Sequence, residues 1–167
     1  MIIYRIRIIL DVEDDVIRDI EIEDKATLEQ LHDIISQSFG FLGGEMASFY
    51  YSDATWEQGD ELPLVDMGNG DLPMNNTLLS EIFIKGIQNL IYVYDFLNLW
   101  IFFVELIENS ENEINKDYPV LIFSHGEVPE NPPIKEFNSK EALENGFLGE
   151  EDLDDDLEDE IDPDSFY

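Results

Sequence analysis

The stretch that decides the fold is Ile91–Glu108, IYVYDFLNLWIFFVELIE, the most apolar part of the chain. Before and after a single break at Leu97-Asn98-Leu99, successive residues are expected to point alternately to the two faces of a strand. This is the pattern of two β-strands joined by a turn. Because both faces of each strand are apolar, we expect the pair in the middle of a sheet covered from both sides. The stretch is short and contains Asp95 and Glu105, so it is not interpreted as a membrane span.

A second hairpin is predicted within residues 2–23, where two alternating segments flank a polar turn. Placing Arg7 opposite Asp19 and Arg5 opposite Glu21 pairs opposite charges, and it also aligns the apolar residues of the other face. We interpret the two arginines as members of exposed ion pairs that fix this register, without a ligand role.

Two amphipathic helices are predicted. Thr27 and Gln30 have the spacing of a capping box, and a glycine ends the apolar stripe that follows. The stripe consists of Leu28, Leu31, Ile35 and Phe39. Thr77 repeats the start signal before a shorter helix. His32 lies beside the stripe of the first helix, and we interpret it as a packing residue.

Two further strands are predicted at Met46–Tyr51 and at Val120–Phe123, the latter as an edge strand. The long connection 52–76 either contains a short strand near Leu62–Val65 or is a functional excursion. Its run 66–71 lacks the alternating ligands and the closing glutamate of a calcium loop, so we interpret it as a turn. These elements predict an α+β fold with a mixed or antiparallel sheet of about five to six strands, one main helix and a short second helix.

The charge of the chain is extreme. Forty acidic and eight basic residues give a net charge of −32 over 167 residues. Such a charge repels phosphate backbones and anionic membrane surfaces, so we expect neither direct nucleic-acid binding nor membrane docking. It favours basic proteins, cations or simply solubility. The absence of cysteine excludes disulfides and thiolate chemistry, and the N-terminus has the pattern of a strand and not of a signal peptide, so we expect a cytoplasmic location.

The composition divides the chain into an α+β domain over residues 1–125, a linker with proline and glycine over 126–149, and an acidic tail over 150–167. Eleven of the fifteen residues from 150 to 164 are acidic, and none is basic. The tail is either a solubilising segment or an element that becomes an amphipathic acidic helix on a basic partner. The predicted partner-binding residues are Leu153, Asp154, Asp155, Asp156, Leu157, Glu158, Asp159, Glu160 and Ile161.

Four segments, in the order YRIRIIL, IRDIEIEDKATLEQLHDIISQSFGF, TLLSEIF and LIYVYDFLNLW, resemble the plasmid pRiA4b ORF-3-like family. The resemblance covers residues 1 to about 125 and implies an α+β domain with a bent sheet and one main helix, β-grasp-like in arrangement. Members of the family carry labels such as transposon passenger protein or resolvase, and the resemblance implies no established activity. The positions that match the family motif are Tyr94, Asp95, Phe96 and Trp100.

The chain departs from the family pattern in three segments. The family's YDFGDxW becomes the seven residues of Tyr94–Trp100, which lack the glycine and the second acid. Its HLHxF becomes Glu45–Phe49, and its Cys-Pro-Pro-Glu-Asp segment becomes Val128–Pro133. A polar site that the family builds from these segments would be largely lost in this member.

The residue pattern does not support an enzymatic function. Serine recombination needs an activated serine among several arginines, whereas the three arginines of this chain all lie in the first hairpin. The two histidines are far apart in sequence, so no metal site or cofactor is predicted. Asp95 is the one acid expected inside an apolar strand, and we interpret it as a cap of the adjacent turn.

We therefore predict a non-catalytic protein-interaction or adaptor module whose acidic tail contacts a basic partner. A DNA mimic or a mobile-element-associated regulatory protein is the alternative, because carboxylates then stand where phosphates would. An enzyme or a calcium-binding protein is less favoured. The sequence predicts no oligomeric state.

Overall fold

The computed structural model describes residues 1–65, 68 and 73–133, and the compact unit of the chain runs from Met1 to Pro133. The predicted acidic tail and its partner-binding residues lie outside the described residues. So does most of the run 66–71 that we interpreted as a turn.

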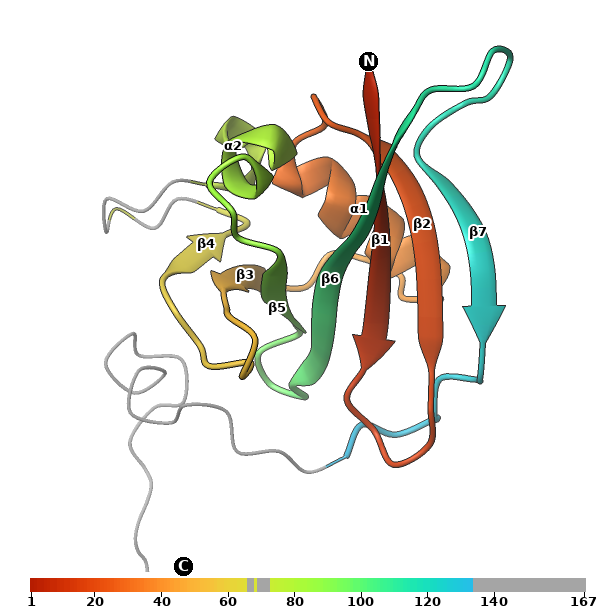
Figure 1. Ribbon diagram of the computed structural model, residues 1–167. Helices are drawn as coiled ribbons and strands as arrows, with labels where there is room; N and C mark the ends of the chain where they lie inside the picture. The colour runs from red at the N-terminus through yellow and green to blue at the C-terminus, as the bar shows by residue number, and fades with distance from the viewer. Residues whose placement is uncertain (66–67, 69–72, 134–167) are drawn as a thin grey trace, which may run out of the picture. The chain divides into compact units, whose positions relative to one another are not determined.

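The described residues form one seven-stranded sheet in the order β4-β3-β5-β6-β1-β2-β7 (Figure 1). Every pair of neighbouring strands is antiparallel, so the antiparallel form of the predicted sheet is present and the mixed form is wrong. The predicted number of strands was too low. The strands are β1 (Ile2–Leu10), β2 (Ile17–Glu23), β3 (Ala47–Tyr51), β4 (Glu61–Pro63), β5 (Asn89–Tyr94), β6 (Trp100–Glu111) and β7 (Val120–His125).

The apolar stretch that decides the fold is the hairpin of β5 and β6, as predicted, with Tyr94 paired to Trp100 across the turn. β6 continues to Glu111, beyond the apolar run, because its polar end pairs with the first residues of β1. The connection 52–76 contains the short strand β4, which pairs with β3. The loop before β4 places Trp56 against Phe103 of β6, with ring centroids 5.0 Å apart. This loop thereby covers part of the sheet face opposite the helices.

Two helices and one short 3-10 turn, η1 (Met74–Asn76), cover the other face, where the main core lies. α1 (Leu28–Ser38) crosses behind the sheet in Figure 1, and α2 (Leu79–Phe83) lies beside its start. The capping box of Thr27 and Gln30 is confirmed. The start of α2 differs from the prediction, because Thr77 donates its hydroxyl to the Pro73 carbonyl and the N-cap is the next residue. No helix among the described residues is long and apolar enough to cross a membrane.

The first hairpin has the predicted register, with Arg7 opposite Asp19 and Arg5 opposite Glu21. The predicted ion pair of Arg7 with Asp19 is confirmed, whereas the predicted pair of Arg5 with Glu21 is wrong. Both arginines bind Asp19, which is fully buried and not exposed. Glu21 is bound instead by Lys116, at 2.6 Å, from the connection between β6 and β7.

Candidate binding site

Asp95, the acidic residue of the family motif, organises the turn between β5 and β6. It lies just after β5, is nearly buried, and has a left-handed backbone conformation with φ of 64°. Its carboxylate accepts hydrogen bonds from the backbone amides of Leu97 and Asn98 at 3.1 and 3.3 Å, and from the Asn98 side-chain amide at 2.6 Å. The side chain therefore caps the turn through backbone amides, as predicted.

The aromatic motif residues pack together at the same turn. Phe41, from the loop after α1, stacks on Tyr94 with ring centroids 4.8 Å apart and lies 5.2 Å from the ring of Trp100. The Tyr94 hydroxyl accepts a hydrogen bond of 3.0 Å from the Gly43 amide, and burial raises the pKa of this hydroxyl. Phe96 is half-buried in the turn. These contacts give the aromatic motif positions a packing role.

The two histidines lie on different elements. His32 on α1 is buried, and its Nδ1 lies 2.6 Å from the hydroxyl of the fully buried Tyr92. Burial lowers the pKa of His32, although Asp33 and Glu29 act in the opposite direction. His125 is the last residue of β7 and is exposed. In the part of the chain that the structure describes, no group of three or more histidine or acidic side chains could hold a metal ion.

The three segments that depart from the family pattern gather at one end of the sheet. Ala47, at the start of β3, pairs with Tyr94 at the end of β5. Leu10, at the end of β1, pairs with Phe102 near the start of β6, so the turn after β1 lies at this same end. Residues 128–133, the third segment, line a groove beside that turn.

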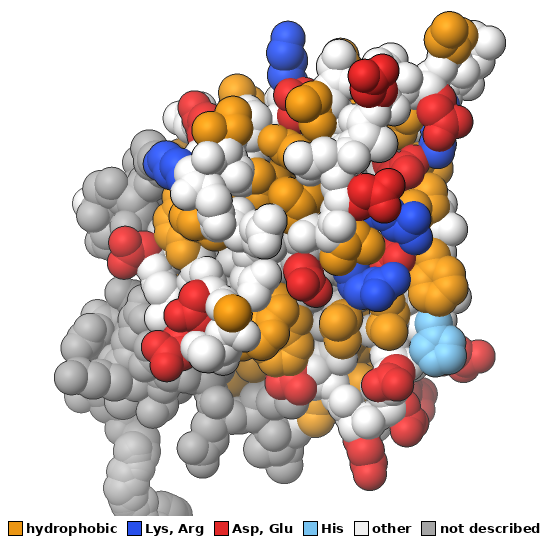
Figure 2. All heavy atoms as spheres, viewed as in Figure 1, with side chains coloured by type: hydrophobic (Ala, Val, Ile, Leu, Met, Phe, Trp, Pro, Cys, Tyr) orange, Lys and Arg blue, Asp and Glu red, His pale blue; other side chains and the backbone are white. Residues whose placement is uncertain are grey.

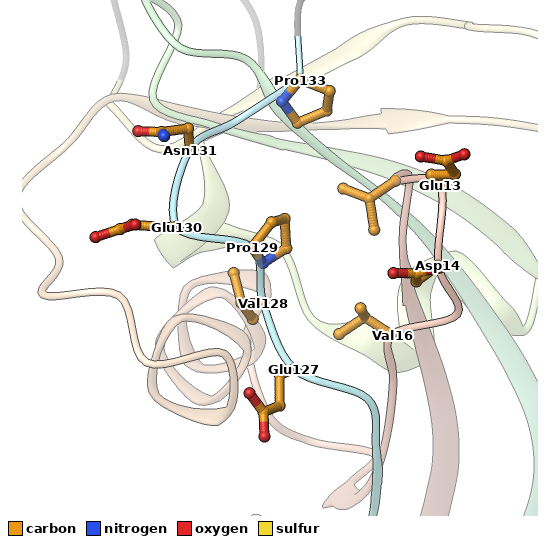
Figure 3. Close-up of a pocket in the computed structure, with 10 residues that line it drawn as sticks. Glu13, Asp14, Val16, Glu127, Val128, Pro129, Glu130, Asn131 and Pro133 are labelled. Carbon is orange, nitrogen blue, oxygen red and sulfur yellow. The ribbon is translucent and has the colours of Figure 1, made fainter.

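The groove has a volume of about 620 Å³ and separates the β1–β2 turn from the segment that follows β7 (Figure 3). Figure 3 shows Val16 pointing toward Val128 and Pro129 across the gap, whereas Glu130 turns outward. The apolar lining residues are Val12, Val16, Val128, Pro129 and Pro133. The charged lining residues are all acidic and exposed: Glu13, Asp14, Glu127 and Glu130. The groove therefore combines an apolar floor with a rim of carboxylates.

Gly126 fixes the wall of the groove. It has a φ of +80°, and a Cβ added there would lie 2.1 Å from the carbonyl oxygen of Asp15 in the β1–β2 turn. Only glycine fits this conformation and this close approach of two backbones. Two residues further on, Val128 packs against the main core. The segment after β7, which the sequence presents as a linker, is thereby held against the domain as far as Pro133.

The basic residues near this part of the sheet are already engaged. Arg5 and Arg7 bind Asp19, and Lys116 binds Glu21, which raises the pKa of the Lys116 ammonium. Arg18 donates to three backbone carbonyls and lies over the ring of Phe39. None of the four rim carboxylates forms an ion pair with a described residue. The rim thus keeps its negative charge uncompensated within this part of the chain.

Sequence reasoning did not find the groove, since its two walls are more than a hundred residues apart in the chain. One local signal was present. A glycine stands between a short apolar strand and a proline-containing segment, and Val128 is the first aliphatic residue after it. The predicted partner-binding residues 153–161 lie outside the described residues, so their position relative to the groove is not described.

The fold and its end groove define a small α+β domain with one antiparallel sheet, helices on one face, and an acidic groove at one end. The chain belongs to the plasmid pRiA4b ORF-3-like protein family, whose pattern matches residues 2–133. It is also similar to MM3350 from Methanosarcina mazei Go1, a crystal structure described as a protein of unknown function, with a TM-score of 0.67 and 19% identity over 77% of this chain and 72% of that one. This similarity supports the fold alone. Comparison with curated proteins gives no match.

Proposed function

We propose that this chain is a non-catalytic protein-interaction module that binds a basic segment of a partner protein in the groove beside the β1–β2 turn. The observation that carries the proposal is the combination of an apolar floor with four exposed carboxylates that no described cation neutralises. A lysine or arginine side chain fits such a groove because its hydrocarbon stem can cover valines while its charged head remains at the acidic rim.

The net charge of −32 supports the same class of partner. It accelerates encounter with a basic protein and repels an acidic one. The acidic tail, with its predicted contact residues from Leu153 to Ile161, would act in the same direction as a second contact element. In this proposal the groove supplies the position of the partner, and the tail adds long-range attraction that salt weakens.

The non-catalytic part of the proposal rests on how the polar residues are used. His32 and Tyr92 bind each other inside the core, and Asp95 caps a turn. Both carboxylate oxygens of Asp19 accept hydrogen bonds from arginines. These groups serve the fold, so among the described residues we assign none of them as a nucleophile or a general base.

The test compares two double variants with the same change in net charge. Glu127→Lys with Glu130→Lys reverses the groove rim, and Glu57→Lys with Asp60→Lys reverses two exposed carboxylates in the loop before β4. Each full-length variant and the wild type are used to capture proteins from native lysate. We expect a basic partner that the wild type and the loop variant hold, and that the groove variant loses. Equal retention by both variants, or no capture by the wild type, would contradict the proposed site.

The same capture tests the alternative of a DNA mimic, which the charge also favours. Duplex DNA is added to the captured complex at low salt. If DNA displaces the partner, the groove and the DNA compete for one basic surface, and the alternative is supported. If DNA leaves the partner in place, the partner uses a surface distinct from its DNA site, and the adaptor function stands.

A further inference from the structure

Among the described strands, β7 is an edge strand without the charges or prolines that commonly protect such strands. In the described part of the chain it pairs only with β2, so its other edge is not paired with a strand. The opposite edge of the sheet is the short strand β4, which ends in Pro63. Natural proteins protect edge strands with charges, prolines or short length, because an unpaired edge is a template for another strand. β4 has these features. β7 has neither a charge nor a proline within the strand, and its one irregularity is a register shift in its pairing with β2, between Asp19 and Ile20.

The sequence of β7 is unusual for its exposed position. The strand VLIFSH contains no Asp, Glu, Lys or Arg, in a chain of which 29% of the residues are charged. Leu121 and Phe123 are 40% and 44% exposed. Figure 2 shows hydrophobic side chains at this side of the sheet, interspersed with basic and acidic side chains. The exposed residues of β7 are therefore uncharged and partly apolar, in a chain with a net charge of −32.

Both ends of β7 are firmly attached to its neighbours. At the end of the strand, the Arg18 guanidinium donates to the His125 carbonyl at 3.0 Å and to the Ser38 carbonyl of α1 at 3.1 Å. Before the strand, Lys116 binds Glu21 of β2 at 2.6 Å. A pairing edge held in place in this way would lose little conformational entropy when another strand is added.

The charges around β7 favour a basic partner over a second copy of this chain. Asp117 and Glu113 are exposed before the strand, and Glu127 lies just beyond its end, beside the acidic groove. Antiparallel pairing of two β7 strands would bring the acidic end of one copy beside the acidic end of the other. A strand with an apolar middle and basic ends places opposite charges at both ends.

We propose that β7 is a pairing edge for an extended segment of the basic partner, which adds an eighth strand and places a lysine or arginine in the adjoining groove. This inference rests on the proposed function and specifies how the partner binds. Backbone hydrogen bonds along β7 supply affinity, and contacts with Leu121 and Phe123 select apolar side chains at alternate positions. The acidic groove then selects a partner with a basic residue next to the added strand.

The test uses two synthetic peptides of equal charge, Lys-Lys-Val-Thr-Val-Thr-Val-Lys-Lys and Lys-Lys-Val-Pro-Val-Pro-Val-Lys-Lys, with the full chain. Proline removes the backbone donors and prevents strand pairing. We expect the threonine peptide to bind at least roughly tenfold more tightly and to slow hydrogen exchange of β7 amides. Equal binding of the two peptides would overturn the pairing edge while leaving the proposed function intact. No binding of either peptide would count against both.

Two variants with the same change in charge test whether the preference depends on the β7 edge. Phe123→Lys places a positive charge on the edge, and Ile114→Lys places the same charge on the 89% exposed tip of the β6–β7 connection. We expect the first variant alone to abolish the preference for the threonine peptide. Circular dichroism verifies that both variants remain folded. An unchanged preference in Phe123→Lys would overturn the inference.

Discussion

The guanidinium of Arg7 holds the fully buried carboxylate of Asp19 through two hydrogen bonds of 2.8 Å each, across the β1–β2 hairpin. Arg5 adds a single, longer bond of 3.2 Å, and its Nε is buried without a hydrogen-bond partner. Arg7 therefore binds the carboxylate more strongly than Arg5 does, although the two arginines occupy equivalent positions on the strand. The paired carboxylate is the one acid that is completely buried on this hairpin.

Replacing Arg7 should cost more stability than replacing Arg5. Arg7→Met leaves the buried carboxylate with one weak donor, whereas Arg5→Met leaves both short bonds in place. Because the arginine side chains are about a third exposed, we expect roughly 2 kcal/mol for Arg7→Met, below the range for a fully buried pair, and under about 1 kcal/mol for Arg5→Met. Urea unfolding of the two variants gives the comparison, and equal losses would show that the two arginines share the carboxylate evenly.

The same carboxylate should make the stability of the protein depend on pH in a defined way. Burial by itself would raise the pKa of Asp19, but the hydrogen bonds from Arg7 and Arg5 outweigh burial and hold the pKa below its ordinary value. Because the pKa of Asp19 is lower in the folded state than in the unfolded state, the ionised carboxylate stabilises the fold at pH values above the unfolded-state pKa, near 4. This contribution is lost as the pH falls through the folded-state pKa. The stability difference between wild type and Asp19→Asn should therefore be constant from about pH 7 to 5 and shrink below about pH 4.

The sequence predicted the register of the first hairpin and the ion pair of Arg7 with Asp19, but not the partners of Arg5 and Glu21. Alternation along both strands determines which residues face each other, so the pairing of Arg7 with Asp19 could be inferred locally. Glu21 binds Lys116, which is 95 residues away in the chain, and that contact depends on β7 lying next to β2. The order of strands in a sheet follows from long-range packing, which residue patterns within one segment do not reveal.

The end groove was missed for the same reason. Its floor combines Val16 from the first hairpin with Val128 from the segment after the last strand. The polar end of β6 is a related case, since Asn109 and Ser110 have no strand pattern and are extended only because β1 lies beside them. By contrast, the turn role of Asp95 could be predicted, because its partners Leu97 and Asn98 are its near neighbours in sequence.

His32 should make the stability of the core depend on pH near neutrality. Burial lowers its pKa, so the folded state binds the proton less readily than the unfolded state. Stability is then lost as the pH falls below the unfolded value, near 6.5, toward the folded pKa. We expect the wild type to lose stability relative to His32→Gln between about pH 7 and 5, measured by urea unfolding at each pH. A difference that stays constant over this range would show that the protonated imidazole is accommodated in the core.

Asp95 should matter for the stability of the β5–β6 turn and not for any binding. Asp95→Ala removes three hydrogen bonds from a nearly buried carboxylate and leaves alanine with a positive φ. We expect a loss of roughly 2 kcal/mol, whereas Asp95→Asn, which keeps acceptor capacity and tolerates positive φ, should lose about 1 kcal/mol or less. Thermal unfolding measures both. Partner capture by the folded Asp95→Asn protein should equal that of the wild type, and its loss would assign Asp95 to the binding surface.

Gly126 provides the sharpest test that the groove is a built feature of the fold. Both Gly126 and Gly86 have positive φ, of 80° and 90°, but a Cβ at Gly86 meets nothing within 4 Å, whereas one at Gly126 meets the Asp15 carbonyl at 2.1 Å. Gly86→Ala should therefore cost about 1 kcal/mol, from backbone conformation alone. Gly126→Ala should cost more, because the segment after β7 must move away from the β1–β2 turn, and this movement opens the groove. We expect Gly126→Ala to weaken capture of the basic partner while Gly86→Ala does not. If the two variants lose the same stability and keep the partner equally well, the close backbone contact does not hold the groove in shape.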